Sequence, residues 1–455
     1  MFGEILQKFA EKSPITVMVR GLLEHLLNPE KIDRWFDSIR QVQYTKEILF
    51  SSIVLLMLQV VCKIRPSVHS AYRHADIGAS VVAVYDKLKG VETATSQGLV
   101  RQIASESEAI IRNLKGTSDP LLPGYRVKFL DGNCIEATEH RLTVLRDTRA
   151  GALPGKSLVV FDAELGIALD VFPCEDGDTQ ERALLTAVAA TIQAGDVWIA
   201  DRNFCVLSFL FNLHRKSAYF VIRQHWNTPD KPLTELKFVG RSATGRVSEQ
   251  TVRLTSPEGE TLIARRIVVQ LEKPTRNGDK RVVILTNRSE AVADALTVSD
   301  RYRNRWKIEP AFQKLEKHLH SEINTLGYPK AALFGFCLAL VAFNLYAVVM
   351  AALRSAHRDC EINEEVSEYY LAQEIATTYT GMLIAVPECD WTVFTEASQT
   401  ELRGMLLNLA RRVALAKFKK NKRGPKKASN PKIHFKGKPH VSTAKLLAAA
   451  AVASG

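Results

Sequence analysis

The sequence lacks closely spaced cysteine pairs. Its seven cysteines are scattered through 455 residues, and none forms a C-x2-C motif with another. This spacing argues against a zinc site and against a disulfide framework. An odd number of dispersed thiols is typical of a reducing compartment, so we predict a cytoplasmic protein without disulfides.

A signal peptide is also missing, because charged residues interrupt any apolar run in the first twelve positions. One uncharged run does occur later, "AALFGFCLALVAFNLYAVVMAAL" at residues 331–353. It is long enough to cross a membrane. A helix buried on all sides inside a large domain has the same composition. The run contains Asn344 and is isolated in a charged chain, so we expect a buried helix and no membrane.

The excess positive charge is confined to one segment. The formal net charge is +12, and twelve Lys or Arg with no Asp or Glu occur between Arg411 and Lys438. The remaining acidic and basic residues balance. A run of this kind is either a solvated tail or an arm that binds nucleic acid.

The apolar patterns predict three regions in a chain that can bury a full core. Residues 1–115 have helical spacing, and two short helical stretches joined by "DIG" resemble a helix-turn-helix, although any helical bundle contains such pairs. Residues 116–375 alternate strands and helices, which predicts an α/β domain with antiparallel hairpins inserted at about 226–280. Residues 376–455 are predicted to be helical, ending in the basic tail.

Three carboxylates stand out within the α/β region. Asp131 and Asp201 each follow an apolar strand, where α/β sheets place their chemistry, and Glu309 is expected on a later helix. Carboxylates far apart in sequence can converge on Mg²⁺, and two such ions support phosphodiester chemistry. Each residue also has a purely structural interpretation: a turn residue, a helix cap and a partner in surface ion pairs, respectively.

Glu309 lies in a basic stretch, "RYRNRWKIEPAFQKLEKHL" at residues 301–319. Tyr302, Arg305 and Glu309 have the i, i+3, i+7 spacing of one helix face. The basic neighbours would hold a polyanion, and the carboxylate would hold the metal ion that acts on it. The surrounding cations would also keep Glu309 ionised, as a metal ligand must be.

Together, "DGN", "IADRNF" and the Y-x2-R-x3-E pattern resemble the DDE transposases of bacterial insertion sequences, in the insertion-sequence-four group. The resemblance covers most of the chain. It implies an RNase H-like catalytic domain with a β-rich insertion, flanked by helical N- and C-terminal regions, of which the first binds DNA. It also implies that Asp131, Asp201 and Glu309 bind two Mg²⁺ ions, for which Mn²⁺ can substitute.

The activity implied by the resemblance is cut-and-paste DNA transposition, with metal-dependent cleavage at transposon ends and transfer of the 3′-OH into target DNA. The expected partners are double-stranded inverted repeats and target DNA, bound by a homodimer at the nucleoid. Tyr302, Arg305, Lys317 and Arg202 would contact this DNA. The alternatives are a metal-dependent nuclease without strand transfer and a catalytically dead DNA-binding repressor.

This chain departs from the family pattern in three places. The family lysine falls at position 316, where this chain has Glu316, and Lys317 is one residue later. Pro310 directly follows Glu309, so we expect a helix break there that could reset the register. The strand "KRVVILTN" also lacks the aromatic residue that stacks on a flipped base in relatives. Trp226 is a candidate substitute, and the sequence leaves a DNA hairpin intermediate open.

Overall fold

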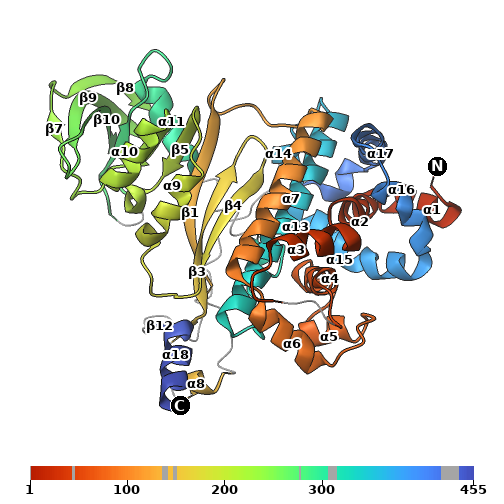
Figure 1. The fold of residues 1–455 in the computed structure, drawn as a ribbon. Helices are drawn as coiled ribbons and strands as arrows, with labels where there is room; N and C mark the ends of the chain where they lie inside the picture. Colours follow the sequence, from red (N-terminus) through yellow and green to blue (C-terminus); the bar gives the residue numbers. More distant parts are fainter. Residues whose placement is uncertain are drawn as a thin grey trace.

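The computed structural model describes residues 2–43, 47–135, 142–146, 151–275, 278–305, 315–421 and 440–454. It shows a mixed α/β protein built on one ten-stranded sheet, with a separate two-stranded sheet near the C-terminus. In Figure 1 the sheet occupies one side of the molecule, and most N- and C-terminal helices gather on the other.

The large sheet has the strand order β4-β3-β1-β5-β6-β11-β10-β9-β7, and β8 pairs with β9. The neighbours β1, β5 and β6 run parallel, and every other pair is antiparallel. The strands are β1 (Arg126–Ile135), β3 (Gly155–Asp162), β4 (Ile167–Cys174), β5 (Asp196–Ala200), β6 (Tyr219–Arg223), β7 (Lys231–Pro232), β8 (Lys237–Ser242), β9 (Gly245–Thr255), β10 (Thr261–Leu271) and β11 (Arg281–Thr286).

The inserted strands are antiparallel, as the alternating sequence predicts, but they are not separate hairpins. They extend the central sheet, because β11 pairs with β6 on one side and with β10 on the other. Alternate residues of β9 and β10 are buried in the two cores of that sheet. Figure 1 shows β7–β10 at the far end of the molecule from helices α1–α4.

Helices cover both faces of the sheet. On one face, α9 (Leu185–Ala190) and α10 (Leu207–Arg215) bury a core that includes Trp198 and Phe220. On the other face, α11 (Ala295–Asn304) packs against a second core. The pattern "TQERALLTAVAATIQAG" at residues 179–195 predicts one long helix capped by Thr179, which is not formed. A 3-10 helix, Glu181–Leu184, precedes the short α9 instead.

The apolar run at 331–353 lies inside α13 (Pro329–Ala356), which is the central helix of the third and largest core. Among the described residues, it is one helix long and apolar enough to cross a membrane, and 94% of its most apolar window is buried in the protein. It contacts helices from both ends of the chain as well as β4. The predicted buried helix is therefore confirmed.

The N- and C-terminal helices share this core. The helices not yet given are α1 (Glu4–Lys12), α2 (Pro14–Leu26), α3 (Pro29–Ile39), α4 (Phe50–Val61), α5 (Val68–Tyr72), α6 (Val81–Gly90), α7 (Thr93–Leu114), α14 (Ile362–Glu365), α15 (Glu368–Ala385), α16 (Thr392–Thr395) and α17 (Gln399–Arg411). Helix α2 packs against α15, α16 and α17. The domain boundaries at about 115 and 375 stay predictions, because apolar packing crosses them.

The helix pair predicted to resemble a helix-turn-helix is present as α5 and α6. The hydroxyls of Ser67 and Ser80 cap the two N-termini by accepting hydrogen bonds from the backbone N–H groups of Ser70 and Ala83. A role in DNA recognition stays a prediction.

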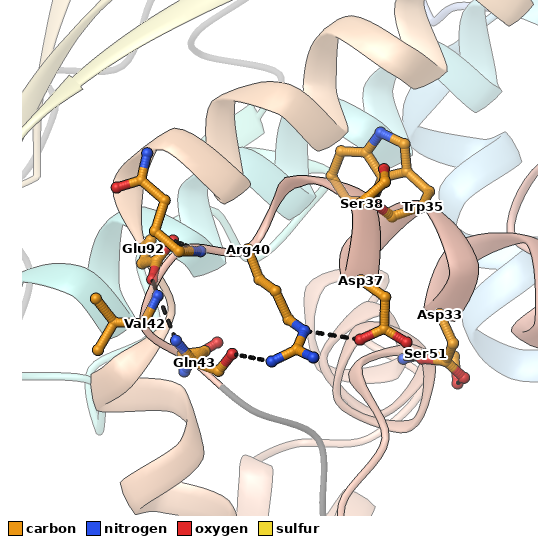
Figure 2. A network of polar contacts seen from close by, with 10 residues as sticks. Asp33, Trp35, Asp37, Ser38, Arg40, Val42, Gln43, Ser51 and Glu92 are labelled. Atoms are coloured by element: carbon orange, nitrogen blue, oxygen red, sulfur yellow. Dashed lines mark hydrogen bonds and ion pairs between the residues drawn. The ribbon is translucent and has the colours of Figure 1, made fainter.

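A polar network fixes the chain between α3 and α7 (Figure 2). The Glu92 carboxylate accepts hydrogen bonds from the backbone N–H groups of Gln41, Val42 and Gln43. Arg40 donates to Asp37 at 2.8 Å and to the Gln43 carbonyl at 2.9 Å. These backbone hydrogen bonds help to hold the pKa of Glu92 below its ordinary value, against the effect of burial. They tie the end of α3 to the start of α7.

Near the C-terminus the chain forms the separate two-stranded sheet. Strand β12 (His440–Ser442) pairs in parallel with β2 (Gly151–Leu153), and α18 (Thr443–Ser454) follows beside α8 (Thr143–Arg146). Lys445 forms ion pairs with Asp176 and Asp178. Most of the predicted basic tail, from residue 422 to 439, lies outside the described residues.

The buried amide of Asn344 connects α13 to the sheet, and we expect its replacement to be costly. Its oxygen accepts from the Ala168 N–H at 2.8 Å, and its nitrogen donates to the Ala168 carbonyl at 2.9 Å. Asn344→Leu would leave both backbone groups without this partner. The free energy of unfolding measured with urea should fall by about 3 kcal/mol. Leu345→Met, a volume-conserving control, should cost less than about 1.5 kcal/mol, and equal losses would contradict this role.

Candidate active site

The pairing of β1 with β5 brings Asp131 and Asp201 close together. The two strands are parallel, and Leu130 is opposite Ala200, so the next residue on each strand is one of the two aspartates. Neighbouring strands lie about 4.8 Å apart. Asp131 does not end its strand, as the sequence suggested. β1 continues to Ile135 along β3, and Asp131 marks the point where β5 stops.

Asp201 also caps a short helix, which was the structural alternative for this residue. It precedes the 3-10 helix Arg202–Phe204 and accepts a hydrogen bond from the Asn203 N–H at 2.7 Å. That bond occupies Oδ1, and no hydrogen bond to Oδ2 is among those of the described residues. Capping and ion binding are therefore compatible at this carboxylate.

Helix α11 brings two of the predicted DNA-contacting residues to the same place. The Arg305 Nη1 lies 3.4 Å from Asp131 Oδ2. Tyr302, one turn earlier, has its ring centre 5.9 Å from the Arg305 guanidinium carbon. Their exposed fractions are only 6% and 9%. The i, i+3 spacing thus directs both side chains toward the aspartates and not toward open solvent.

The electrostatics of Asp131 are those of a crowded acidic site. Burial raises its pKa to about 6, although the Arg305 charge and the Gly132 N–H act in the opposite direction. Asp201 and Glu181 raise the pKa further by repulsion. Neighbouring carboxylates that destabilise one another's ionised forms suit a hard divalent cation, which prefers oxygen ligands.

Several predicted site residues cannot be placed with this pair. Glu309 and Pro310 fall in residues 306–314, outside the described residues. Lys317 is described and exposed, and its carbonyl accepts a hydrogen bond from Lys63 at 2.5 Å. Arg202 is exposed beside Asp201. Burial lowers the pKa of His225, and the charges of Arg182 and Arg202 lower it further. No group of three His, Cys, Asp or Glu suited to a metal ion occurs among the described residues.

Glu181 was not among the site residues predicted from the sequence. Its carboxylate accepts a hydrogen bond from the Asn203 side chain at 2.6 Å and is close to Asp131. It also occupies the space where a Cβ of residue 132 would lie, since an added Cβ would stand 2.0 Å from its Oε1. The glycine of "DGN" therefore makes room for a carboxylate. Gly132 was visible in the sequence, but "DGN" was interpreted as a turn.

A cavity of about 530 Å³ opens beside the site, with Arg182, His225 and Asn227 among its lining residues. Arg182 donates to the Asn203 carbonyl at 3.0 Å, which links the cavity to the loop after Asp201. Trp226 follows β6, the strand next to β5, and is 85% exposed. Its ring lies 5.7 Å from that of His225.

Residues 122–345 match the family model described as the transposase DDE domain. The matched region is slightly less than half of the chain and contains all three predicted carboxylates. The match supports a DDE transposase. No curated protein matches this chain. A cryo-EM structure of a piggyBac transposase synaptic complex with hairpin DNA is similar over 86% of this chain and 85% of that one, at 9% identity and a TM-score of 0.39. A likeness this low supports no conclusion about fold or activity.

The close approach of Gly132 and Glu181 can be tested by coupled substitutions. Gly132→Ala should lower the free energy of unfolding by about 1 kcal/mol, because Glu181 must move and give up its hydrogen bond to Asn203. In a Glu181→Ala background the same change should cost almost nothing. A urea-unfolding double-mutant cycle measures the coupling. Additive effects would show that the two residues do not meet.

Proposed function

We propose that this chain is a transposase that cleaves DNA at transposon ends and joins the freed 3′-OH to target DNA. The observation that carries the proposal is the pair of aspartates on adjacent parallel strands, inside the region that matches the DDE domain. We further propose an RNase H-like domain of the insertion-sequence-four group and a bacterial source. A mixed sheet with helices on both faces supports the first of these.

In this proposal, Asp131, Asp201 and Glu309 hold two Mg²⁺ ions, or Mn²⁺ in their place. Bound ions of this kind activate the attacking oxygen and stabilise the leaving one. Arg305 positions the Asp131 carboxylate from one side and limits the repulsion between the acids. Glu181, held by Asn203, adds negative charge that favours cation binding.

The proposed DNA contacts surround this pair. Arg202, on the exposed loop after Asp201, and Lys317 would bind phosphates, as would Arg305 and Tyr302 at the carboxylates. The exposed ring of Trp226 supports a role in contacting a base beside the site, because it follows the strand next to β5. The proposed partners are transposon ends and target DNA, bound by a homodimer in the nucleoid.

Asp201→Asn should abolish cleavage and leave DNA binding intact. The amide keeps the oxygen that caps Asn203 but loses the negative charge that a cation needs. We expect cleavage in Mg²⁺ to fall more than about 100-fold, beyond the usual cost of disturbing an outer-shell partner. The assay uses duplexes from the DNA that flanks the gene, and gel shift measures binding.

Asp359→Asn, which removes one exposed carboxylate in a turn after α13, is the matched control and should retain activity. Loss of binding in Asp201→Asn would assign that residue a structural role. Cleaved ends that never join a second duplex would favour the nuclease. Binding without cleavage by the wild type in Mg²⁺ and Mn²⁺ would favour the repressor.

The basic tail should contribute sequence-independent affinity for DNA. A deletion after Arg412 is a poor test, because it would remove β12, α18 and the hydrogen bond from the Lys420 N–H to the Glu365 carbonyl at 2.7 Å. Replacing the seven Lys and Arg between 422 and 438 by Gln keeps these elements. The slope of log K against log salt should become shallower by about 0.9 for each phosphate that the tail no longer neutralises.

Lys445→Gln is the control for the tail substitutions, because Lys445 already forms ion pairs with Asp176 and Asp178. Its slope should match that of the wild type. An unchanged slope in the tail variant would show that this segment does not touch DNA.

A further inference from the structure

Four residues form one row across four neighbouring strands of the insertion. Arg241 of β8 is opposite Arg246 of β9, Arg246 is opposite Gln270 of β10, and Gln270 is opposite Arg281 of β11. Residues directly opposite one another project from the same face of a sheet. All four are exposed. The insertion therefore presents three guanidinium groups and one amide in a line.

The charges in this row are not balanced by the protein. Arg241 has one partner, Glu272 at 3.3 Å, and both side chains of that pair are about two-thirds exposed. Such exposed pairs contribute little stability. Among the described residues, Arg246 and Arg281 have no carboxylate within ion-pair distance. Like charges opposite each other, as in Arg241 and Arg246, destabilise a sheet, so folding does not account for the row.

One member of the row is held in place by an aromatic ring. The Arg246 guanidinium lies 4.8 Å from the ring centre of Phe238, which is 55% exposed. A cation–π contact at an exposed site contributes about 0.5–1 kcal/mol. It orients the planar guanidinium while leaving its N–H donors available to a phosphate, which arginine binds with two parallel hydrogen bonds.

The row lies beyond the end of β5 that carries Asp201, but on the opposite face of the sheet from Asp131. Leu285 of β11 is opposite Ile222, and Ile222 is opposite Ala200, the residue before Asp201. Arg281 precedes Leu285 on an antiparallel strand, so it lies beyond the end of β5, on the order of 15 Å from Asp201. Leu285 belongs to the core beneath α10, which places the row on that face of the sheet.

We propose that Arg241, Arg246, Gln270 and Arg281 form a phosphate-binding strip for the backbone of duplex DNA. Three strand spacings make the strip about 14 Å long, which spans roughly four phosphates of one DNA strand at a rise of 3.4 Å each. This inference rests on the proposed function, because it assumes that DNA is the substrate of the neighbouring site. It adds a second DNA-binding surface, on the face of the sheet opposite to Asp131.

The test compares two triple variants of the full chain. The strip variant carries Arg241→Gln, Arg246→Gln and Arg281→Gln. The control variant carries Lys231→Gln, Lys237→Gln and Arg253→Gln, three exposed residues of the same sheet. On β9, Lys237 is opposite Glu249 and Lys231 is opposite Arg253. Glu249 and Arg253 are at odd positions of that strand, whereas Arg246 is at an even position. The control therefore removes the same charge from the opposite face.

Fluorescence anisotropy with a 30-base-pair duplex of arbitrary sequence, at about 50 and 200 mM salt, measures the effect. With three fewer phosphates neutralised, at a slope of 0.9 each, the salt increase should weaken the wild type about 40-fold more than the strip variant. The control variant should behave as the wild type. The single variant Arg246→Gln should show about one third of the change in slope, and it serves if the triple variant fails to fold.

Three results would overturn the strip. The strip variant could keep the slope of the wild type, the two triple variants could show equally reduced slopes, or Arg246→Gln could leave the slope unchanged in a folded protein. A wild type that binds no duplex at all would instead refute the proposed function. A wild type that binds and cleaves, beside a strip variant with an unaltered slope, would refute the strip alone.

Discussion

The parallel pairing of β1 with β5 is the constraint on which the candidate site depends. One register, with Leu130 opposite Ala200, places Asp131 and Asp201 side by side. A slip of one residue would turn the following side chains to the other face. The apolar residues before each aspartate prevent such a slip, because Phe129 and Ile199 are buried in one core and Leu130 and Ala200 in the other.

The other parts of the site meet this pair from both faces of the sheet. Helix α11 brings Tyr302 and Arg305 from one face, and the 3-10 helix before α9 brings Glu181 from the other. Arg305 forms an ion pair with Asp131, yet the pKa of that aspartate stays raised because burial outweighs the attraction. Burial and the repulsion from Asp201 and Glu181 therefore outweigh the one ion pair that Asp131 forms among the described residues.

Large parts of the fold were predictable because they depend on local pattern. The strands β3, β4, β5, β6 and β11 and the buried helix α13 lie where apolar runs of matching length occur. The predicted helix at 179–195 was too long. Its first part forms a 3-10 helix, which places Glu181 near Asp131. The prediction for the insertion was correct in giving antiparallel strands. It was wrong in treating them as hairpins separate from the central sheet, because strand pairing between distant segments leaves no periodic signal.

The sequence by itself determined the candidate carboxylates, the basic character of the stretch after Arg301 and the buried state of the apolar run at 331–353. These follow from residue type and local spacing, which act over a few neighbours. Only the tertiary structure decided that Gly132 accommodates Glu181, that the C-terminus pairs with β2, and that three arginines align across the insertion. Each of these depends on the register between strands or on the space left by a distant residue. Local sequence patterns reveal neither the register nor that space.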